Sequence, residues 1–249
     1  MTQHIVTIIG DSLALPRPED NLFERDLYPA RLQSLLGPSF FVVNRSTVGN
    51  YAIRAGSQET AVYAIQGTQA GCYVIQFGIV DCAPRLFTLE ERTILVALFR
   101  SRLLKRFARA WVDYRSRRRF ALTKEMQILR TPPDDFEMCY RNVVGNILAL
   151  TQARKIVAIN IAAPGASLVD RSYGIAENVE RYNEIIGRIA SEHTGKMVVM
   201  DVYSETKRDP SLVLADGHHL CAALHARIAE RLAAIVAALD LGEPARAEK

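Results

Sequence analysis

Five short apolar runs constrain the fold of this 249-residue chain more than any other feature of the sequence. Each run is rich in β-branched residues and shows no alternation of polar and apolar positions, which is typical of strands buried on both faces. Strands of this kind lie inside parallel sheets that helices cover on both sides. The expected strands are His4–Ile9, Phe40–Asn44, Tyr73–Phe77, Ile156–Ile161 and Met197–Val202.

The segments between these runs carry apolar residues at helical spacing. The clearest expected helices are Leu27–Leu36, Phe136–Ala153, Ile175–His193 and His219–Leu239. A succession of strands and helices with right-handed crossovers predicts an α/β fold of the flavodoxin-like kind. We therefore expect one domain over residues 1–249, a three-layer α/β/α sandwich with a five-stranded parallel sheet.

One interval, at about residues 86–133, is too long for a simple strand-to-helix loop and is interpreted as a helical insertion. Its main helix is expected over Leu89–Trp111. Between Arg100 and Arg130 the chain has eleven Lys and Arg residues against two acidic residues. Such a segment suits an anionic membrane surface, or a lid over a polyanionic substrate, but simple solvation of its arginines is an equal alternative. No nucleic-acid motif accompanies it, so we expect no nucleic-acid partner.

The first apolar run ends in the tripeptide Gly-Asp-Ser at residues 10–12. In a parallel α/β sheet, ligands bind beyond the carboxyl ends of the strands, so Ser12 is expected where chemistry takes place. A helix cap without any chemistry explains Asp-Ser equally well. The tripeptide alone leaves both interpretations open.

A second polar cluster, Asp216 and His219, lies near the other end of the chain, where a loop leads into the last expected helix. A carboxylate and an imidazole at this spacing can lie close together. Such a pair activates a serine, because the imidazole takes the hydroxyl proton while the acid orients the ring and stabilises its charged form. A lone histidine usually has a surface or capping role, but Ser12, Asp216 and His219 together favour nucleophilic catalysis.

These motifs resemble those of the SGNH hydrolase superfamily, the GDSL esterases and lipases. "GDSL" at Gly10–Leu13 is similar to the first conserved block, which makes Ser12 the nucleophile. "VNRSTVGNY" at Val43–Tyr51 resembles the second block, in which Gly49 contributes a backbone N–H to the oxyanion hole. The resemblance also implies the SGNH form of the three-layer fold.

"DGHHL" at Asp216–Leu220 resembles the fifth block of the same superfamily. The resemblance makes Asp216 the acid and His219 the base. His219 is chosen over His218 because the histidine of this block is followed by leucine.

The third block departs from the superfamily pattern. Gly-x-Asn-Asp is replaced by "GIVD" at residues 78–81, so that Val80 stands where the family has an asparagine that donates to the oxyanion. Loss of one such donor costs roughly 10²–10³ in rate. By position, Arg85 and Asn50 are candidate substitutes, and Asp81 lies in the same loop. Arg85 also suits a carboxylate or phosphate on the substrate, or else a salt bridge with Asp81 or an acidic residue of the insertion.

The leading hypothesis is a serine-dependent enzyme acting on an ester of a small molecule or glycan precursor, for which an anionic substrate is one of the open alternatives. Transfer of the acyl group to water makes it an esterase, and transfer to a sugar hydroxyl makes it an O-acyltransferase. The competing hypothesis is a protein that keeps the fold for binding or other group transfer. No metal-ligand cluster or phosphate-binding glycine loop is visible, so neither a metal nor another cofactor is expected. Four scattered cysteines and the lack of a signal-peptide pattern favour a cytoplasmic protein, with a peripheral place at the membrane as the alternative that the basic insertion suggests. The oligomeric state stays open.

Overall fold

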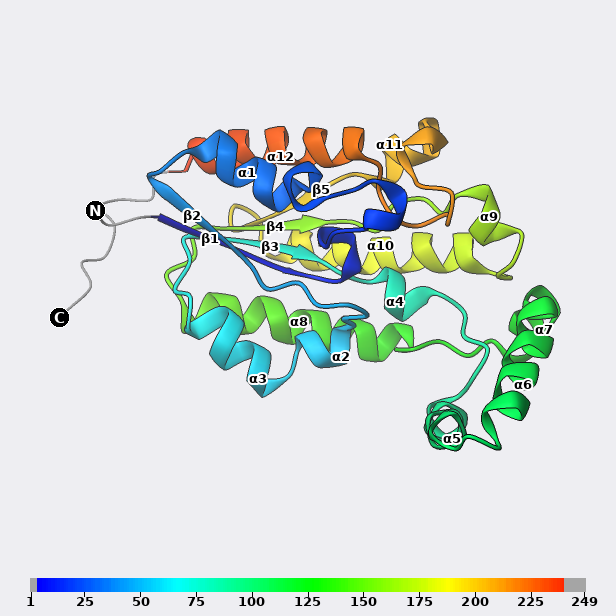
Figure 1. Ribbon diagram of the computed structural model, residues 1–249. Coiled ribbons are helices and arrows are strands. Elements are labelled where there is room, and N and C mark those ends of the chain that lie inside the picture. The colour runs from blue at the N-terminus through cyan, green and yellow to red at the C-terminus, as the bar shows by residue number, and fades with distance from the viewer. Residues whose placement is uncertain (1–3, 240–249) are drawn as a thin grey trace.

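A computed structural model describes residues 4–239 and shows a three-layer α/β/α sandwich (Figure 1). The central sheet has five parallel strands in the order β2-β1-β3-β4-β5. The fold class expected from the sequence is therefore confirmed. The first three and last ten residues of the expected domain lie outside the described residues. The strands are β1 (His4–Gly10), β2 (Phe40–Asn44), β3 (Cys72–Gln76), β4 (Lys155–Ile159) and β5 (Met197–Met200).

Helices cover both faces of the sheet (Figure 1). The helices α1 and α12 lie on one face, and α2, α8 and α10 lie on the other. None of the helices in the described part of the chain is long and apolar enough to span a bilayer. The helices are α1 (Tyr28–Leu36), α2 (Ala52–Ala55), α3 (Gln58–Thr60), α4 (Ile79–Cys82), α5 (Leu89–Arg100), α6 (Lys105–Arg117), α7 (Arg119–Met126), α8 (Pro133–Leu150), α9 (Ala166–Val169), α10 (Ile175–Glu192), α11 (Tyr203–Arg208) and α12 (Ala222–Ala237).

The strands supply two hydrophobic cores because successive side chains point to opposite faces of the sheet. In β3, Tyr73 and Ile75 pack against α8 and α10, whereas Cys72 and Val74 pack against α1 and α12. Both sets are fully buried. This burial on both faces explains why the strands appear in the sequence as continuous apolar runs.

The last helix begins three residues later than the sequence predicts. The expected range began at His219, but α12 begins at Ala222. The preceding residues close a tight loop through an antiparallel bridge between Val213 and Leu220. The expected helix therefore loses its first turn to a loop that holds two site residues.

The insertion is built from α5, α6 and α7, and the expectation of one main helix over Leu89–Trp111 is wrong. The helix ends at Arg100, where the Ser101 Oγ accepts a hydrogen bond from the backbone N–H of Leu104 at 3.4 Å. Serine hydroxyls compete with helical hydrogen bonds in this way. The turn folds α6 back on α5, so that the Arg115 guanidinium meets the Glu91 carboxylate at 2.8 Å.

The insertion lies beside the carboxyl ends of the strands, on the side of α4 and α9 (Figure 1). Polar contacts fasten it to the main body. The Arg119 guanidinium donates to the Ser172 hydroxyl at 2.9 Å and to the Pro84 carbonyl at 2.9 Å. The backbone N–H of Tyr173 donates to Thr123 Oγ1 at 3.0 Å. These contacts place the arginine-rich segment next to the edge of the sheet where Ser12 lies.

Candidate active site

Ser12 begins a short 3-10 turn directly after β1. Asp11 caps this turn, because its Oδ1 accepts from the backbone N–H of Leu13 at 2.9 Å. Gly10 is needed for a close approach: a Cβ at this position would lie 2.6 Å from Ser46 Oγ and 3.2 Å from the Gln76 carbonyl. Asp11 is therefore the cap that the alternative interpretation requires, while the Ser12 side chain stays free for other contacts.

The loop before α12 presents a carboxylate and an imidazole toward Ser12. The Asp216 Oδ1 accepts from the backbone N–H groups of His218 and His219, both at 3.1 Å. Gly217 has a φ of +85°, and a Cβ there would lie 2.7 Å from the Leu168 Cβ. A side chain at Gly217 is thus excluded by both backbone conformation and space.

The structure brings Ser12, His219 and Asp216 together in one hydrogen-bonded relay. The Ser12 Oγ lies 3.1 Å from His219 Nε2, although the two residues are 207 positions apart. On the other side of the ring, His219 Nδ1 lies 2.6 Å from Asp216 Oδ2. With the proton on Nδ1, the imidazole Nε2 accepts a hydrogen bond from the Ser12 hydroxyl. This arrangement is able to draw the proton from the serine hydroxyl.

The pKa shifts of the pair suit a neutral base beside an ionised acid. Burial raises the pKa of Asp216, but the backbone N–H groups of His219 and His218, together with the two imidazole rings, outweigh that effect and hold the pKa well below its usual value. Burial lowers the pKa of His219 and outweighs the opposing effect of the Asp216 carboxylate. His219 therefore stays neutral, and able to accept a proton, further into the acid range than a free histidine.

Arg17, which the sequence did not single out, contacts both members of the pair. Its Nη1 lies 3.3 Å from His219 Nε2, and its Nη2 lies 3.2 Å from Asp216 Oδ2. Asp20 holds the same guanidinium through Nε at 2.7 Å. The cation lies beside the nitrogen that must become positively charged, so it disfavours the imidazolium. Only the neighbouring prolines mark this position in the sequence, and they carry no chemical signal.

A cavity of about 250 Å³ opens beside Ser12. Val80 lines it at the position where the resemblance places an asparagine, so this side chain offers no hydrogen-bond donor. Arg85 lines the same cavity and forms no ion pair with Asp81 or with any other carboxylate of residues 4–239; it donates to the Val80 carbonyl instead. Other lining residues are Ile79, Ala83, Arg119, Leu168, Arg171 and His218.

The remaining expected site residues take different places. Gly49 lies in the loop after β2 with a φ of +64°. That loop is tied to Gly10, whose carbonyl accepts from Thr47 N at 3.1 Å and from Asn50 Nδ2 at 3.0 Å. Asn50 is buried, and this contact makes it a support for the turn that carries Ser12.

Asp81 does not line the cavity. Its side chain is fully buried, and its Oδ1 accepts from the backbone N–H of Ala52 at 2.9 Å. Burial raises the pKa of this carboxyl to about 6. The geometry thus gives Asp81 the role of joining α4 to α2, rather than that of a group presented to a ligand.

One group of possible metal ligands occurs among the described residues, formed by Asp216, His218 and His219. Two of its members already bind each other at 2.6 Å, and the Arg17 guanidinium contacts both. His218 faces the cavity, and burial lowers its pKa to about 4. A neutral His218 beside Ser12 is able to donate or accept a hydrogen bond from a ligand. The arrangement suits proton transfer better than coordination of a cation.

Comparison with known proteins supports the fold. No protein-family model and no curated protein sequence matches this chain. The structure is similar to an alpha/beta hydrolase enzyme from the metagenome of Lake Arreo, Spain, with a TM-score of 0.61, 18% identity, and coverage of 96% of this chain and 98% of that one. An acetyl xylan esterase follows with a TM-score of 0.61, 14% identity, and coverage of 93% and 99%.

A carbohydrate acetylesterase from Sinorhizobium meliloti is similar over 95% of this chain and 99% of its own, with a TM-score of 0.57 and 13% identity. At this level of identity the likeness shows a shared fold. The fold is the one that the SGNH resemblance implies, a parallel five-stranded sheet between two layers of helices.

Proposed function

We propose that this protein is a serine-dependent ester hydrolase of the SGNH type. The observation that carries the proposal is the relay from Ser12 through His219 to Asp216, with separations of 3.1 Å and 2.6 Å. It lies at the carboxyl edge of a parallel sheet, where ligands of α/β proteins bind. Two of the similar structures are described as a carbohydrate acetylesterase and an acetyl xylan esterase, which supports the general reaction class.

In the proposed reaction, His219 takes the Ser12 proton as the Oγ attacks the ester carbonyl. The carbonyl oxygen becomes an oxyanion, and the C–O bond to the leaving alcohol then breaks as His219 returns the proton to it. The product is an acyl group on Ser12. Water releases it as an acid, whereas a sugar hydroxyl takes it in an acyl transfer, and product analysis with an added acceptor separates these outcomes.

We assign the oxyanion to two backbone donors. The N–H groups of Ser12 and Gly49 find no acceptor within residues 4–239, and both belong to segments that meet at Gly10. Val80 supplies no third donor. A two-donor site stabilises the tetrahedral intermediate less than a three-donor site, so we expect slow turnover of simple esters.

The decisive experiment is labelling of the intact protein with a fluorophosphonate probe, followed by mass spectrometry of the labelled peptide. We expect the label on Ser12, and a loss of p-nitrophenyl acetate turnover by roughly 10³-fold or more in Ser12→Ala. Ser34→Ala, on the exposed surface of α1, is the matched control and keeps full activity. An unlabelled Ser12, together with turnover unchanged in Ser12→Ala, contradicts the proposal.

Val80 favours one alternative function. A protein that keeps this fold for binding, or for group transfer without an acyl-enzyme, has no need of a third oxyanion donor. That alternative predicts no labelling at Ser12 together with retained binding of a ligand in the adjacent cavity.

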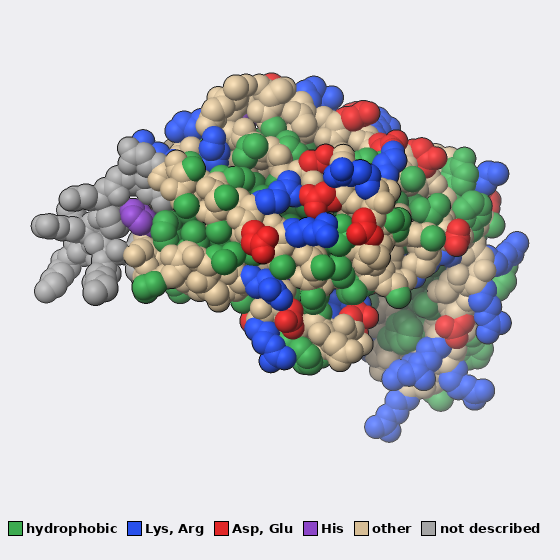
Figure 2. Space-filling view, turned by 90° about the horizontal axis from the view of Figure 1, so that it is seen from above, with side chains coloured by type: hydrophobic (Ala, Val, Ile, Leu, Met, Phe, Trp, Pro, Cys, Tyr) green, Lys and Arg blue, Asp and Glu red, His purple; other side chains and the backbone are tan. Residues whose placement is uncertain are grey.

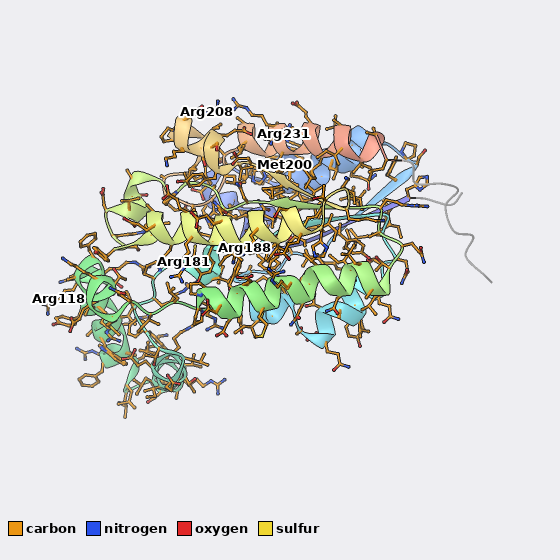
Figure 3. The ribbon with its side chains drawn as sticks, turned by 180° about the vertical axis from the view of Figure 1, so that it is seen from behind. Arg118, Arg181, Arg188, Met200, Arg208 and Arg231 are labelled. Atoms are coloured by element: carbon orange, nitrogen blue, oxygen red, sulfur yellow. The ribbon has the colours of Figure 1, made fainter. Side chains whose placement is uncertain are left out.

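We further propose that the insertion rests on an anionic membrane surface from the cytoplasmic side. Leu103 and Phe107 are 82% and 72% exposed, with exposed arginines around them at positions 102, 106 and 109. Figure 3 shows Arg118 on the outer side of the insertion, away from the sheet. Exposed apolar side chains flanked by cations match the interface of such a membrane. The four cysteines are unpaired, which is consistent with a reducing compartment.

A further inference from the structure

Three arginines converge on the cavity beside Ser12. They are Arg85 after α4, Arg119 at the start of α7 and Arg171 after α9. Their hydrogen bonds go to neutral groups: Arg85 donates to the Val80 carbonyl, Arg119 to the Ser172 hydroxyl and Pro84 carbonyl, and Arg171 to the Asp216 carbonyl at 2.7 Å. None of the three pairs with a carboxylate of the described residues.

This concentration of positive charge is partly shielded from water. Burial lowers the pKa of Arg85, and the neighbouring guanidiniums of Arg92, Arg119 and Arg130 lower it further. Burial and Arg171 lower the pKa of Arg119 in the same way. The Nε of Arg85 is buried without an acceptor. Arg85 and Arg119 are half-buried, whereas Arg171 is exposed. Unpaired cations this close together repel one another, and a bound anion relieves that repulsion.

A second cavity, of about 440 Å³, continues from Arg85 and Arg119, and Arg92 also lines it. Arg85 and Arg119 line both cavities and therefore stand between them. The second cavity runs along α5, where its lining is mostly apolar. Figure 2 shows the surface hollowed between the main body and the insertion, with Lys and Arg side chains gathered over the insertion beside the hollow. The apolar lining residues are Leu86, Phe87, Leu95, Val96 and Phe99.

Ser12, the guanidiniums and the apolar groove follow one another along the two cavities, so successive parts of one ligand are expected to contact them in that order. We infer that the substrate is an anionic amphiphile, an ester that carries a phosphate or carboxylate bound by Arg85, Arg119 and Arg171, and beyond it an aliphatic chain along α5. Guanidiniums bind both kinds of anion through paired N–H donors. This inference rests on the proposed function for the ester, whereas the anion and chain sites stand on the two cavities.

Binding is tested without catalysis by calorimetric titration of Ser12→Ala protein with octyl phosphate below its micelle concentration. Inorganic phosphate tests the anion site alone, octanol tests the groove alone, and nonanoate replaces the phosphate by a carboxylate. We expect octyl phosphate to bind at least about 30-fold more tightly than phosphate, because several methylene groups leave water. We expect octanol to bind weakly or not measurably, since it offers no charge to the guanidiniums. Equal affinity for octyl phosphate and phosphate overturns the inference.

Paired variants separate the two parts of the site. Arg119→Gln and Arg171→Gln are each expected to weaken the binding of octyl phosphate roughly tenfold, because each removes a charged hydrogen bond. Arg109→Gln, at an exposed position outside both cavities, is the control. Val96→Asp is expected to weaken the binding of octyl phosphate and to leave the affinity for inorganic phosphate unchanged. Val62→Asp, at an exposed position, is its control. The inference is contradicted if the site variants lose no more affinity for octyl phosphate than their control variants do.

A protection experiment connects this site to the catalytic one. Octyl phosphate is expected to slow fluorophosphonate labelling of Ser12 in the unmodified protein. If octyl phosphate binds but Ser12 is never labelled, the proposed esterase function fails and the amphiphile site stands. If Ser12 is labelled and octyl phosphate does not bind, the esterase stands and the inference fails.

Discussion

Replacing Arg17 with methionine tests the electrostatics of the proposed catalytic base. The guanidinium lies 3.3 Å from His219 Nε2, the atom that carries the extra proton when the imidazole is charged. Two unit charges at that distance repel by about 1.3 kcal/mol even with the dielectric constant of water. That energy corresponds to about one pKa unit. Arg17→Met should therefore raise the pKa of His219 by about one unit or more.

The sign of the effect follows from the role of the base. His219 must be neutral to accept the Ser12 proton, so a higher pKa makes activity disappear at a higher pH on the acid side. The assay is the pH profile of kcat/KM for p-nitrophenyl acetate, which reports the free enzyme. The acid midpoint of Arg17→Met should lie about one unit above that of the unaltered protein. Salt at 0.1 M should change this little, since the Debye length of roughly 10 Å exceeds the separation.

Two control variants make the result specific. Arg17→Lys keeps a cation near the imidazole and should shift the midpoint much less than methionine does. Arg25→Met removes an exposed arginine from a neighbouring turn and should leave the profile unchanged. An acid midpoint that stays in place or moves down in Arg17→Met would refute the idea that Arg17 acts on the charged form of His219.

Three further predictions concern other parts of the molecule. Val80→Asn, which offers an amide donor in the cavity beside Ser12, should raise kcat for p-nitrophenyl acetate by about tenfold or more; an unchanged or lower kcat contradicts the two-donor oxyanion site. Burial raises the pKa of Asp11 from 3.8 to about 7, so the folded state holds its proton more tightly and stability falls as pH rises. As pH rises from 5 to 8, this group should lower the free energy of unfolding by about 3 kcal/mol. In urea denaturation, Asp11→Asn should not show this fall. The protein should sediment with phosphatidylserine liposomes but not with phosphatidylcholine liposomes, and a variant with Arg102→Glu and Arg109→Glu should stay in the supernatant; equal recovery of both proteins there excludes the membrane proposal.

The layers of the fold could be predicted because strands that are buried on both faces are continuous runs of apolar residues in the sequence. Residues such as Tyr73 and Val74 face opposite layers of helices, so both are apolar and the run is continuous. The break in the expected helix Leu89–Trp111 was not predictable in this way. It depends on a serine hydroxyl at position 101 and on the packing of α6 against α5, and neither changes the apolar spacing.

The site residues that belong to sequence motifs could be predicted, whereas those outside any motif could not. Ser12, Asp216 and His219 stand in short patterns whose spacing implies a role, and the structure brings their side chains together. Arg17, Arg119 and Arg171 reach the site from three separate segments, so only the folded chain reveals them as neighbours. Asp81 and Asn50 lie within the sequence motifs, yet their polar side-chain atoms bond to backbone groups in the protein interior.

The separation of 207 positions between Ser12 and His219 has a consequence for biosynthesis. During synthesis Ser12 leaves the ribosome early, and His219 leaves it only after β5 and the loop that follows it have been made. Nascent chains and N-terminal fragments lack His219 beside Ser12, so under the proposed mechanism we expect them to be inert toward esters. The proposed reactivity toward esters is thereby withheld until the last helix packs against α1 and completes the three layers.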